Sequence, residues 1–309
     1  MSEPIHVPVI LGPTGVGKTG LALELAGRFG MEIVSCDSRQ VYRGMDIGTA
    51  KPTPAQQARA RHWLIDILEP SESYSAFRYA RDAREVIVRR AAAGVPVALC
   101  GGTGLYFRSL SRGLTTMVAS NPELRKRLER RAEAEGPGIL HEELARVDPA
   151  SARRLHPNDR QRIVRALQVF YDSGIPLSAH VDGPEGPVDM HFAIIILSRP
   201  REDLYARINR RVRHMIELGL WREHKALIDK GFGREDPGMR CVGYRELFDV
   251  AEGKTSLETA IGRIQQNTRR YAKRQKTWFA HQCDGHVLDM AGSNVLSRAA
   301  ELVGRHLGA

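Results

Sequence analysis

Short apolar runs alternate with amphipathic stretches through most of the chain. The apolar runs predict buried strands, because each has the length of a strand and ends at a turn signal. We place these strands at 7–11, 32–36, 63–68, 95–100 and 192–197. Between them, apolar residues recur with helical spacing and predict helices at 18–26, 75–93 and 202–218. This alternation predicts a parallel sheet covered by helices, which is an α/β fold.

The pattern changes between residues 118 and 190. No strand pattern occurs there, and helical spacing with Pro and Gly stops predicts four helices. They are placed at 121–131, 139–147, 149–155 and 157–173. We therefore expect an α/β core formed by 1–117 and 191–309, interrupted by an all-helical insertion domain at 118–190.

The chain carries a basic surplus on an ordinary globular composition. Its 309 residues are 42% hydrophobic, enough for a core, and the formal net charge is +10. This charge favours a polyanionic partner, although an arginine-rich genome would give the same surplus. The stretch 259–283 is more specific, because it has no Asp or Glu and interleaves Lys and Arg with Tyr271, Trp278 and Phe279. A basic helix with aromatic residues suits a nucleic-acid backbone and unstacked bases.

The four cysteines indicate whether the protein works in a reducing or an oxidising cellular compartment. Cys36, Cys100, Cys241 and Cys283 form no C-x-x-C pair, so neither a zinc site nor a disulfide framework is indicated. The N-terminus lacks the pattern of a signal peptide, and no apolar run approaches the roughly 20 residues of a membrane span. We expect a cytoplasmic protein with reduced thiols and no membrane contact.

One motif follows the first predicted strand. It reads Gly12-Pro13-Thr14-Gly15-Val16-Gly17-Lys18-Thr19 and fits the phosphate-binding loop G-x-x-x-x-G-K-[ST]. Its glycines let N–H groups turn toward phosphate oxygens, and the following helix adds a partial positive charge. Lys18 supplies a full charge, and the Thr19 hydroxyl can help to hold Mg²⁺. A chance Gly-rich turn is the alternative, but the strand before and the apolar helix after fit the motif. The motif requires only a di- or triphosphate.

Polar residues follow two further predicted strands. Asp37 comes after 32–36, and Gly101-Gly102-Thr103-Gly104 comes after 95–100. Ligands bind outside the carboxyl ends of strands in open α/β sheets, which places Asp37 and Thr103 near the phosphate loop. Asp37 as a helix cap, and the glycines as a turn without a ligand, are the alternatives. No acidic residue ends 95–100, so the second acidic Mg²⁺ ligand of a standard ATPase is missing there.

Two arginines stand four residues apart in the predicted helix 202–218. Arg207 and Arg211 therefore share a helix face, from which two guanidinium groups can clamp a diphosphate. Ordinary surface charge is the alternative, since Glu202 and Asp203 lie nearby. The locally basic run 160–165 has the same alternative, a solvated helix face.

These pieces together resemble the tRNA dimethylallyltransferase family. The resemblance runs in order from about residue 6 to 280, and it rests on six blocks of sequence. They are Gly12–Thr19, Asp37–Tyr42 with Asp46–Pro52, Gly101–Tyr106, Gln161–Leu167, Gly243–Glu246 and Arg270–Trp278. The blocks Asp46–Pro52 and Lys273–Trp278 are the specific ones, because the phosphate loop also occurs in unrelated enzymes. The zinc-finger extension of eukaryotic members is not seen, so the bacterial type is the expectation.

The resemblance implies a P-loop NTPase-like core with a helical insertion, and a prenyl transfer reaction. A dimethylallyl group would pass from dimethylallyl diphosphate to N6 of the adenosine just 3′ of the tRNA anticodon. The loop would then hold the diphosphate of the donor and not ATP, with Mg²⁺ as cofactor. Asp37 would be the general base, and Thr103 would support the transition state. We expect a monomer that binds the anticodon stem-loop.

The resemblance also implies the residues that contact the two substrates. The diphosphate would be bound by Gly12, Thr14, Gly15, Val16, Gly17, Lys18 and Thr19, to which the spacing argument adds Arg207 and Arg211. The tRNA would be bound by Asp37, Ser38, Arg39, Gln40, Gln161, Arg162, Ile163, Val164, Arg165, Arg240, Cys241, Val242, Gly243, Tyr244 and Arg245. The basic stretch adds Lys273 and Arg274.

Three other functions fit part of the sequence. A P-loop kinase of a small metabolite explains the loop, and the insertion as a lid, but leaves 259–283 without a role. An isopentenyltransferase of free adenine nucleotides does not require the basic C-terminal half. An RNA-binding module without catalysis does not explain why Lys18, Thr19, Asp37 and Thr103 all stand at strand ends.

Overall fold

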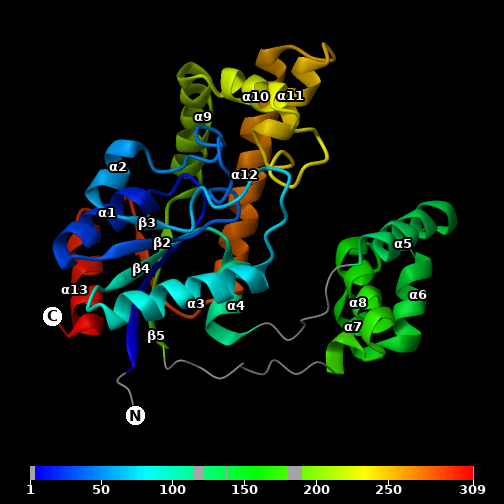
Figure 1. Cartoon of the computed structure of the whole chain (residues 1–309), viewed down its shortest axis with the longest axis horizontal. Coiled ribbons are helices and arrows are strands. Elements are labelled where there is room, and N and C mark those ends of the chain that lie inside the picture. The colour runs from blue at the N-terminus through cyan, green and yellow to red at the C-terminus, as the bar shows by residue number, and fades with distance from the viewer. Residues whose placement is uncertain (1–3, 114–120, 137, 180–189, 309) are drawn as a thin grey trace. The chain divides into compact units, whose positions relative to one another are not determined.

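The computed structural model describes residues 4–113, 121–136, 138–179 and 190–308. The chain forms two compact units, Met1–Ser111 with Gly186–Ala309, and Arg112–Glu185. The predicted boundary between the first part of the core and the insertion domain, at 117 and 118, lies outside the described residues. The predicted boundary between the insertion domain and the second part of the core falls between Met190 and His191, which is inside a strand, because that strand already begins at Met190. Figure 1 labels the elements of both units.

The larger unit is built on one parallel sheet. Its strands are β1 (Ile5–Leu11), β2 (Glu32–Cys36), β3 (His62–Trp63), β4 (Val97–Gly101), β5 (Met190–Ser198) and β6 (His286–Asp289). They lie in the order β3-β2-β4-β1-β5-β6, and every pair is parallel. The predicted α/β fold with a parallel sheet is thus confirmed. Because the strands are parallel, β1, β2 and β4 deliver the residues that follow them to one edge of the sheet.

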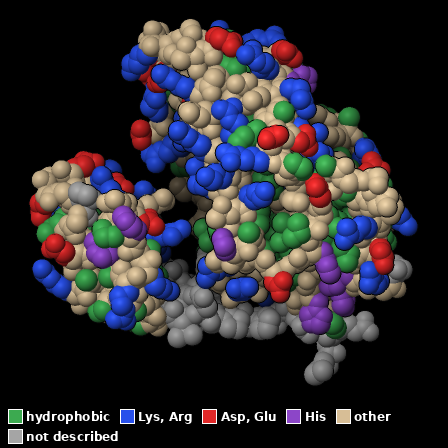
Figure 2. Space-filling model, turned by 180° about the vertical axis from the view of Figure 1, so that it is seen from behind, with side chains coloured by type: hydrophobic (Ala, Val, Ile, Leu, Met, Phe, Trp, Pro, Cys, Tyr) green, Lys and Arg blue, Asp and Glu red, His purple; other side chains and the backbone are tan. Residues whose placement is uncertain are grey.

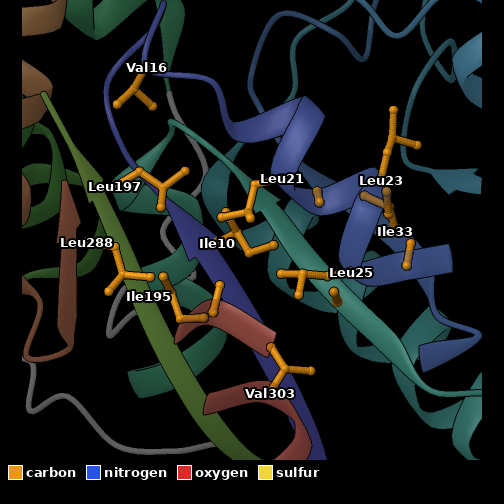
Figure 3. Close-up of a cluster of buried hydrophobic side chains, with 14 of the residues drawn as sticks. Ile10, Val16, Leu21, Leu23, Leu25, Ile33, Ile195, Leu197, Leu288 and Val303 are labelled. Carbon is orange, nitrogen blue, oxygen red and sulfur yellow. The ribbon is translucent and has the colours of Figure 1, made fainter. Parts of the chain in front are cut away.

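Helices cover the sheet. They include α1 (Lys18–Phe29), α2 (Pro54–Arg59), α3 (Ala76–Ala92), α4 (Gly104–Arg112) and α13 (Val295–Leu307). Ser75 caps α3 by accepting a hydrogen bond from the Arg78 N–H. Figure 3 shows one buried cluster, in which Ile10 and Ile195 of the sheet meet Leu25 of α1 and Val303 of α13. Burial of each such side chain stabilises the fold by about 1.5–3 kcal/mol.

A second buried cluster joins the helices that follow β5. These are α9 (Arg201–Leu218), α10 (Leu220–Asp229), α11 (Tyr244–Ala251) and the long α12 (Leu257–Gln282). Helices α9 and α12 pack side by side (Figure 1). Gly219, at a φ of 107°, ends α9 and begins α10, so the chain turns there without a loop. The basic stretch 259–283 lies on the single helix α12, except for Cys283, which caps the end of that helix.

Two strand predictions differ from the structure. The strand expected at 63–68 is the two-residue β3, because Leu64 and Asp66 have φ values of 60° and 53°, outside the β region. Strand β6 was not predicted, since the four residues His286–Asp289 carry no clear alternation. None of the helices in the described ranges combines the length and apolar composition of a bilayer crossing.

The smaller unit is helical throughout its described residues. It contains α5 (Pro122–Glu135), α6 (Gly138–Val147), α7 (Pro149–Arg154), α8 (Arg160–Ser173) and the short η1 (Leu177–Ala179). The predicted tRNA contacts Gln161 to Arg165 lie on the first turns of α8. Ile163 and Val164 are buried in the core of this unit, whereas Gln161 and Arg162 are exposed and Arg165 is half-buried. The side chains of Ile163 and Val164 therefore stabilise the unit.

Candidate functional site

The phosphate loop joins β1 to α1. Gly12, Gly15 and Gly17 have φ values of 156°, 83° and 116°, which side chains with a Cβ rarely adopt. A Cβ on Gly12 would also lie 2.8 Å from the Leu197 carbonyl oxygen of β5. Lys18 Nζ donates to the carbonyl oxygens of Gly12 and Pro13, at 2.9 and 3.0 Å. The three glycines thus have the backbone conformations that the motif predicted for them.

Several N–H groups of this loop are available to a ligand. In the described part of the chain, the backbone N–H groups of Gly15, Gly17, Lys18 and Thr19 have no protein acceptor. They come directly before or within the first turn of α1, where a helix favours anions. The Val16 side chain is fully buried, so it can contribute only backbone atoms.

Arg207 and Arg211 of α9 both reach the phosphate loop. Arg207 Nε donates to the Gly15 carbonyl at 3.1 Å, and Arg211 Nη2 donates to Thr14 Oγ1 at 2.5 Å. The Arg211 Nε is buried and has no hydrogen-bond partner. Burial lowers the pKa of Arg211, while the Asp37 carboxylate opposes that change and Arg207 adds to it. A guanidinium with a buried spare donor is suited to an anion, and ordinary surface charge does not describe either residue.

Asp37 and Thr103 lie at the ends of the adjacent strands β2 and β4. Thr103 Oγ1 accepts from the Ser38 N–H at 3.0 Å, and the Thr103 N–H donates to the Cys36 carbonyl at 3.1 Å. The close approach of the chain after β4 to the end of β2 requires a glycine at position 101, because a Cβ there would lie 2.0 Å from the Cys36 carbonyl oxygen. Asp37 Oδ1 accepts from the Arg39 N–H at 2.8 Å. The segment after Asp37 forms bends and turns, so Asp37 caps no helix, but its carboxylate does cap the start of that segment.

Asp37 borders two cavities. The first, of about 190 Å³, is lined by the phosphate loop, Thr19, Gln40, Arg207 and Gly101 among others. The second, of about 270 Å³, is lined by residues of α9, α12 and the segment 240–245. Both cavities are lined by Thr14, Lys18, Asp37, Thr49 and Arg211. Burial lowers the pKa of Lys18, and the nearby Asp37 carboxylate counteracts part of that effect. The Asp37 carboxylate thus lies where the first cavity, at the phosphate loop, borders the larger second cavity.

Most of the predicted tRNA contacts in the larger unit line the second cavity. They are Asp37, Ser38, Arg39, Arg240, Cys241, Val242, Gly243, Arg245 and Arg274. Gln40 instead lines the first cavity, where Nε2 donates to the Ala50 carbonyl at 3.2 Å. Tyr244 is fully buried and lines neither. Lys273 lines a separate depression of about 340 Å³ with Arg201, Lys276 and His281. The predicted pair Lys273 and Arg274 therefore faces two different surfaces.

Two side chains of α12 belong to the site although neither was among the predicted site residues. Gln275 Oε1 accepts from the Thr14 N–H, and Gln275 Nε2 donates to the Gly102 carbonyl, each at 2.8 Å. Tyr271, one turn earlier, lines the second cavity, and burial raises its pKa. Their spacing of four residues places them on one helix face. A glutamine in a basic helix gives no signal of this kind by itself.

Few side chains beside the phosphate loop could bind a metal ion. In the described ranges, no three His, Cys, Asp or Glu side chains gather as a metal-ligand set. Thr19 lines the first cavity and offers a hydroxyl oxygen beside the phosphate loop. Mg²⁺ commonly binds through one or two protein oxygens together with substrate phosphates and water. The residues present fit Mg²⁺ in that form, and do not form a cage that would bind it without the substrate.

Comparison with known proteins places this geometry in a family. The family model described as IPP transferase matches residues 40–282. The tRNA dimethylallyltransferase of Desulfosudis oleivorans is 48% identical over 275 residues, which are 89% of this chain and 88% of that protein. The tRNA isopentenylpyrophosphate transferase of Bacillus halodurans has a crystal structure that is 36% identical, covers 98% of each chain and gives a TM-score of 0.71.

A second solved structure extends the likeness to eukaryotes. It shows a eukaryotic dimethylallyltransferase acting on tRNA, is 28% identical, and covers 96% of this chain and 77% of that one with a TM-score of 0.80. The family resemblance found in the sequence is thereby confirmed. This chain belongs to the IPP transferase family.

Proposed function

We propose that this protein transfers a dimethylallyl group from dimethylallyl diphosphate to N6 of the adenosine 3′-adjacent to the anticodon in tRNA, releasing diphosphate. The observation that carries the proposal is the position of Asp37, a carboxylate that lines both the phosphate-loop cavity and the larger second cavity. Relatives named tRNA dimethylallyltransferase support the reaction, and they favour it over the kinase alternative.

The donor diphosphate would occupy the first cavity. The spare N–H groups of the phosphate loop, Lys18 and the guanidinium groups of Arg207 and Arg211 would bind its oxygens. Mg²⁺, held by the Thr19 hydroxyl and the phosphates, would supply further positive charge against the leaving group. Electrostatic stabilisation of this kind is often the largest catalytic effect in such a transfer.

The acceptor amine needs a base. The N6 lone pair of adenine is delocalised into the ring, so the amine attacks well only as its proton leaves. Asp37 would take that proton while N6 forms a bond to C1 of the allyl group. The C1–O bond breaks, and the diphosphate departs with the electron pair. Thr103 holds the Ser38 backbone at 3.0 Å, next to Asp37, and would support this arrangement.

The second cavity would receive the base and the prenyl tail. Its lining includes apolar side chains of α9, α10 and α12, namely Val212, Met215, Leu220 and Ile264. A five-carbon tail requires such a dry wall, because water would compete with the amine for the allylic carbon. The target adenosine lies in a loop of the tRNA and can be flipped from its stack for a few kcal/mol.

The tRNA backbone would meet basic side chains at the second cavity and on a separate surface. Figure 2 shows Lys and Arg side chains gathered over one face of the larger unit. Arg240, Arg245 and Arg274 at the second cavity, and Lys273 on its own surface, would contact phosphates. Gln161, Arg162 and Arg165 of the helical unit would add contacts. We further propose a monomer that acts in the cytoplasm, where its tRNA substrate is found.

The decisive experiment mixes the purified protein with Mg²⁺, unmodified tRNA and labelled dimethylallyl diphosphate. Parallel reactions contain ATP, or AMP in place of tRNA. Label in tRNA without ATP hydrolysis is the expected result. Label on AMP alone would move the function to prenylation of free nucleotides. ATP turnover without prenyl transfer would contradict the proposal and favour a kinase.

A further inference from the structure

The loop at Asp46–Ala50 forms a wall of both cavities. Gly48 and Thr49 line the second cavity, and Thr49 and Ala50 line the first. This loop belongs to the sequence block Asp46–Pro52, which was specific in the resemblance but has no chemical group assigned to the reaction. Its position beside Asp37 raises the question of what fixes its conformation.

A single carboxylate binds three consecutive N–H groups of this loop. Glu223 of α10 accepts through Oε2 from the N–H groups of Asp46 and Ile47, at 3.0 and 2.9 Å. Glu223 Oε1 accepts from the Gly48 N–H at 3.2 Å. Successive N–H groups that converge on one anion hold a backbone in a defined turn. Glu223 therefore anchors the first half of the wall.

The same carboxylate holds the segment that leads into α11. The Tyr244 hydroxyl donates to Glu223 Oε1 at 2.5 Å. Burial raises the pKa of Tyr244, so the hydroxyl keeps its proton and remains a donor. The Tyr244 ring packs on Gly48, where a Cβ would lie 2.4 Å from a ring carbon. Tyr244 directly follows residues 240–243, which line the second cavity. Glu223 thus connects two walls of that cavity.

The second half of the loop has its own anchor. The buried Lys51 Nζ donates to the Tyr42 carbonyl at 2.7 Å and to the carboxylates of Asp46 and Asp66, each at 2.5 Å. These bonds do not involve Glu223. Removal of the Glu223 contacts should therefore displace Gly48 and Thr49 without releasing the whole loop.

We propose that Glu223 is a positioning residue for the transfer reaction. It fixes the wall formed by Gly48, Thr49 and the 240–244 segment, and this wall determines where the acceptor base lies relative to Asp37. Glu223 touches neither substrate in this assignment, since it acts through the backbone N–H groups and Tyr244. The inference rests on the proposed function, whose reaction supplies the readout.

The test is Glu223→Gln in full-length protein, assayed with tRNA and labelled dimethylallyl diphosphate. An amide presents only one acceptor oxygen, so the variant loses the contacts of the other oxygen. We expect kcat to fall at least tenfold, while the affinity for inorganic diphosphate with Mg²⁺, measured by calorimetry, stays within twofold. Tyr244→Phe should lower kcat less, and adding it to Glu223→Gln should lower kcat by less than the product of the two separate effects. Asp229→Asn, an exposed acid on the same helix, is the matched control.

Two results with Glu223→Gln would overturn this inference by itself. Unchanged kcat and KM in Glu223→Gln, with an active wild-type protein, would show that the wall does not need the carboxylate. Equal losses of transfer and diphosphate binding, with a lowered melting temperature, would assign Glu223 to general stability. A wild-type protein that transfers nothing would refute the proposed function itself, and this inference with it.

Discussion

Gln275 and Thr14 are 261 residues apart in the sequence, yet the side chain of one accepts the backbone N–H of the other at 2.8 Å. The amide nitrogen of the same side chain, Gln275 Nε2, donates to the Gly102 carbonyl. One side chain of α12 therefore joins both glycine-rich loops at the edge of the sheet. The helix that carries the basic surface is thus bonded to the loop that we expect to hold the diphosphate.

Loss of this amide should impair the phosphate loop. Gln275→Leu keeps much of the volume but removes both hydrogen bonds, and leaves the half-buried Thr14 N–H and the buried Gly102 carbonyl without these partners. Each unsatisfied group costs about 1–3 kcal/mol, so we expect the KM for dimethylallyl diphosphate to rise at least tenfold. Steady-state kinetics with tRNA would measure this. Gln266→Leu on the exposed face of α12 is the control, and an equal effect in both variants would contradict the prediction.

The carboxylate of Asp37 allows a conservative substitution. In Asp37→Asn, the amide oxygen can still accept from the Arg39 N–H, so the turn that follows β2 should be kept. The base is lost, and transfer should fall by about 10²–10⁴-fold, the usual range for a general base. Binding of tRNA should change less than threefold in a filter-binding assay. Turnover at the wild-type rate would remove Asp37 from the proton transfer.

The neighbours Lys273 and Arg274 allow two surfaces to be separated. Arg274 lines the second cavity and Lys273 lines another depression, so their alanine variants test different contacts. Each lost phosphate contact should weaken tRNA binding and reduce the slope of log K against log salt by about one. Titrations at several salt concentrations would measure both slopes. If only Arg274→Ala changes the slope, the depression around Lys273 does not bind the tRNA backbone.

The sequence predicted the sheet and the phosphate loop because both depend on local patterns. The spacing Gly12, Gly17, Lys18 specifies its own backbone, and the apolar strands specify burial. It did not predict the bond from Gln275 to Thr14 or the anchoring of residues 46–48 by Glu223. Both contacts join segments that are distant in the chain. Gln275 lies in the block Lys273–Trp278 that carries the resemblance, but the block does not reveal which backbone groups its side chain binds, and Glu223 stands in no recognisable motif. The sequence also did not predict the positive φ of Leu64, because leucine seldom adopts such a conformation.

The imidazole of His224 should make stability depend on pH. His224 is fully buried beside Trp221 and Phe248, with ring centroids 5.7 and 4.7 Å away. Neither ring nitrogen has a hydrogen-bond partner among the described residues, although the nearby Tyr244 backbone opposes part of the effect of burial on the His224 pKa. Burial lowers the pKa of His224 from 6.5 to about 4. Below pH 6.5 the unfolded chain therefore binds a proton that the folded protein excludes. The resulting loss of stability grows as the pH falls from 6.5 to about 4.

At pH 5 this loss should reach about 2 kcal/mol, since each pKa unit corresponds to 1.36 kcal/mol. Urea unfolding at pH 7 and pH 5 would measure it in wild type and in His224→Phe, which keeps an aromatic ring but cannot titrate. Other groups lower the stability of both proteins alike, so the difference between them reports His224. We expect the variant to lose about 2 kcal/mol less than wild type over this interval. The same loss in both proteins would mean that the imidazole accepts a proton without unfolding, and that its burial does not oppose the charge.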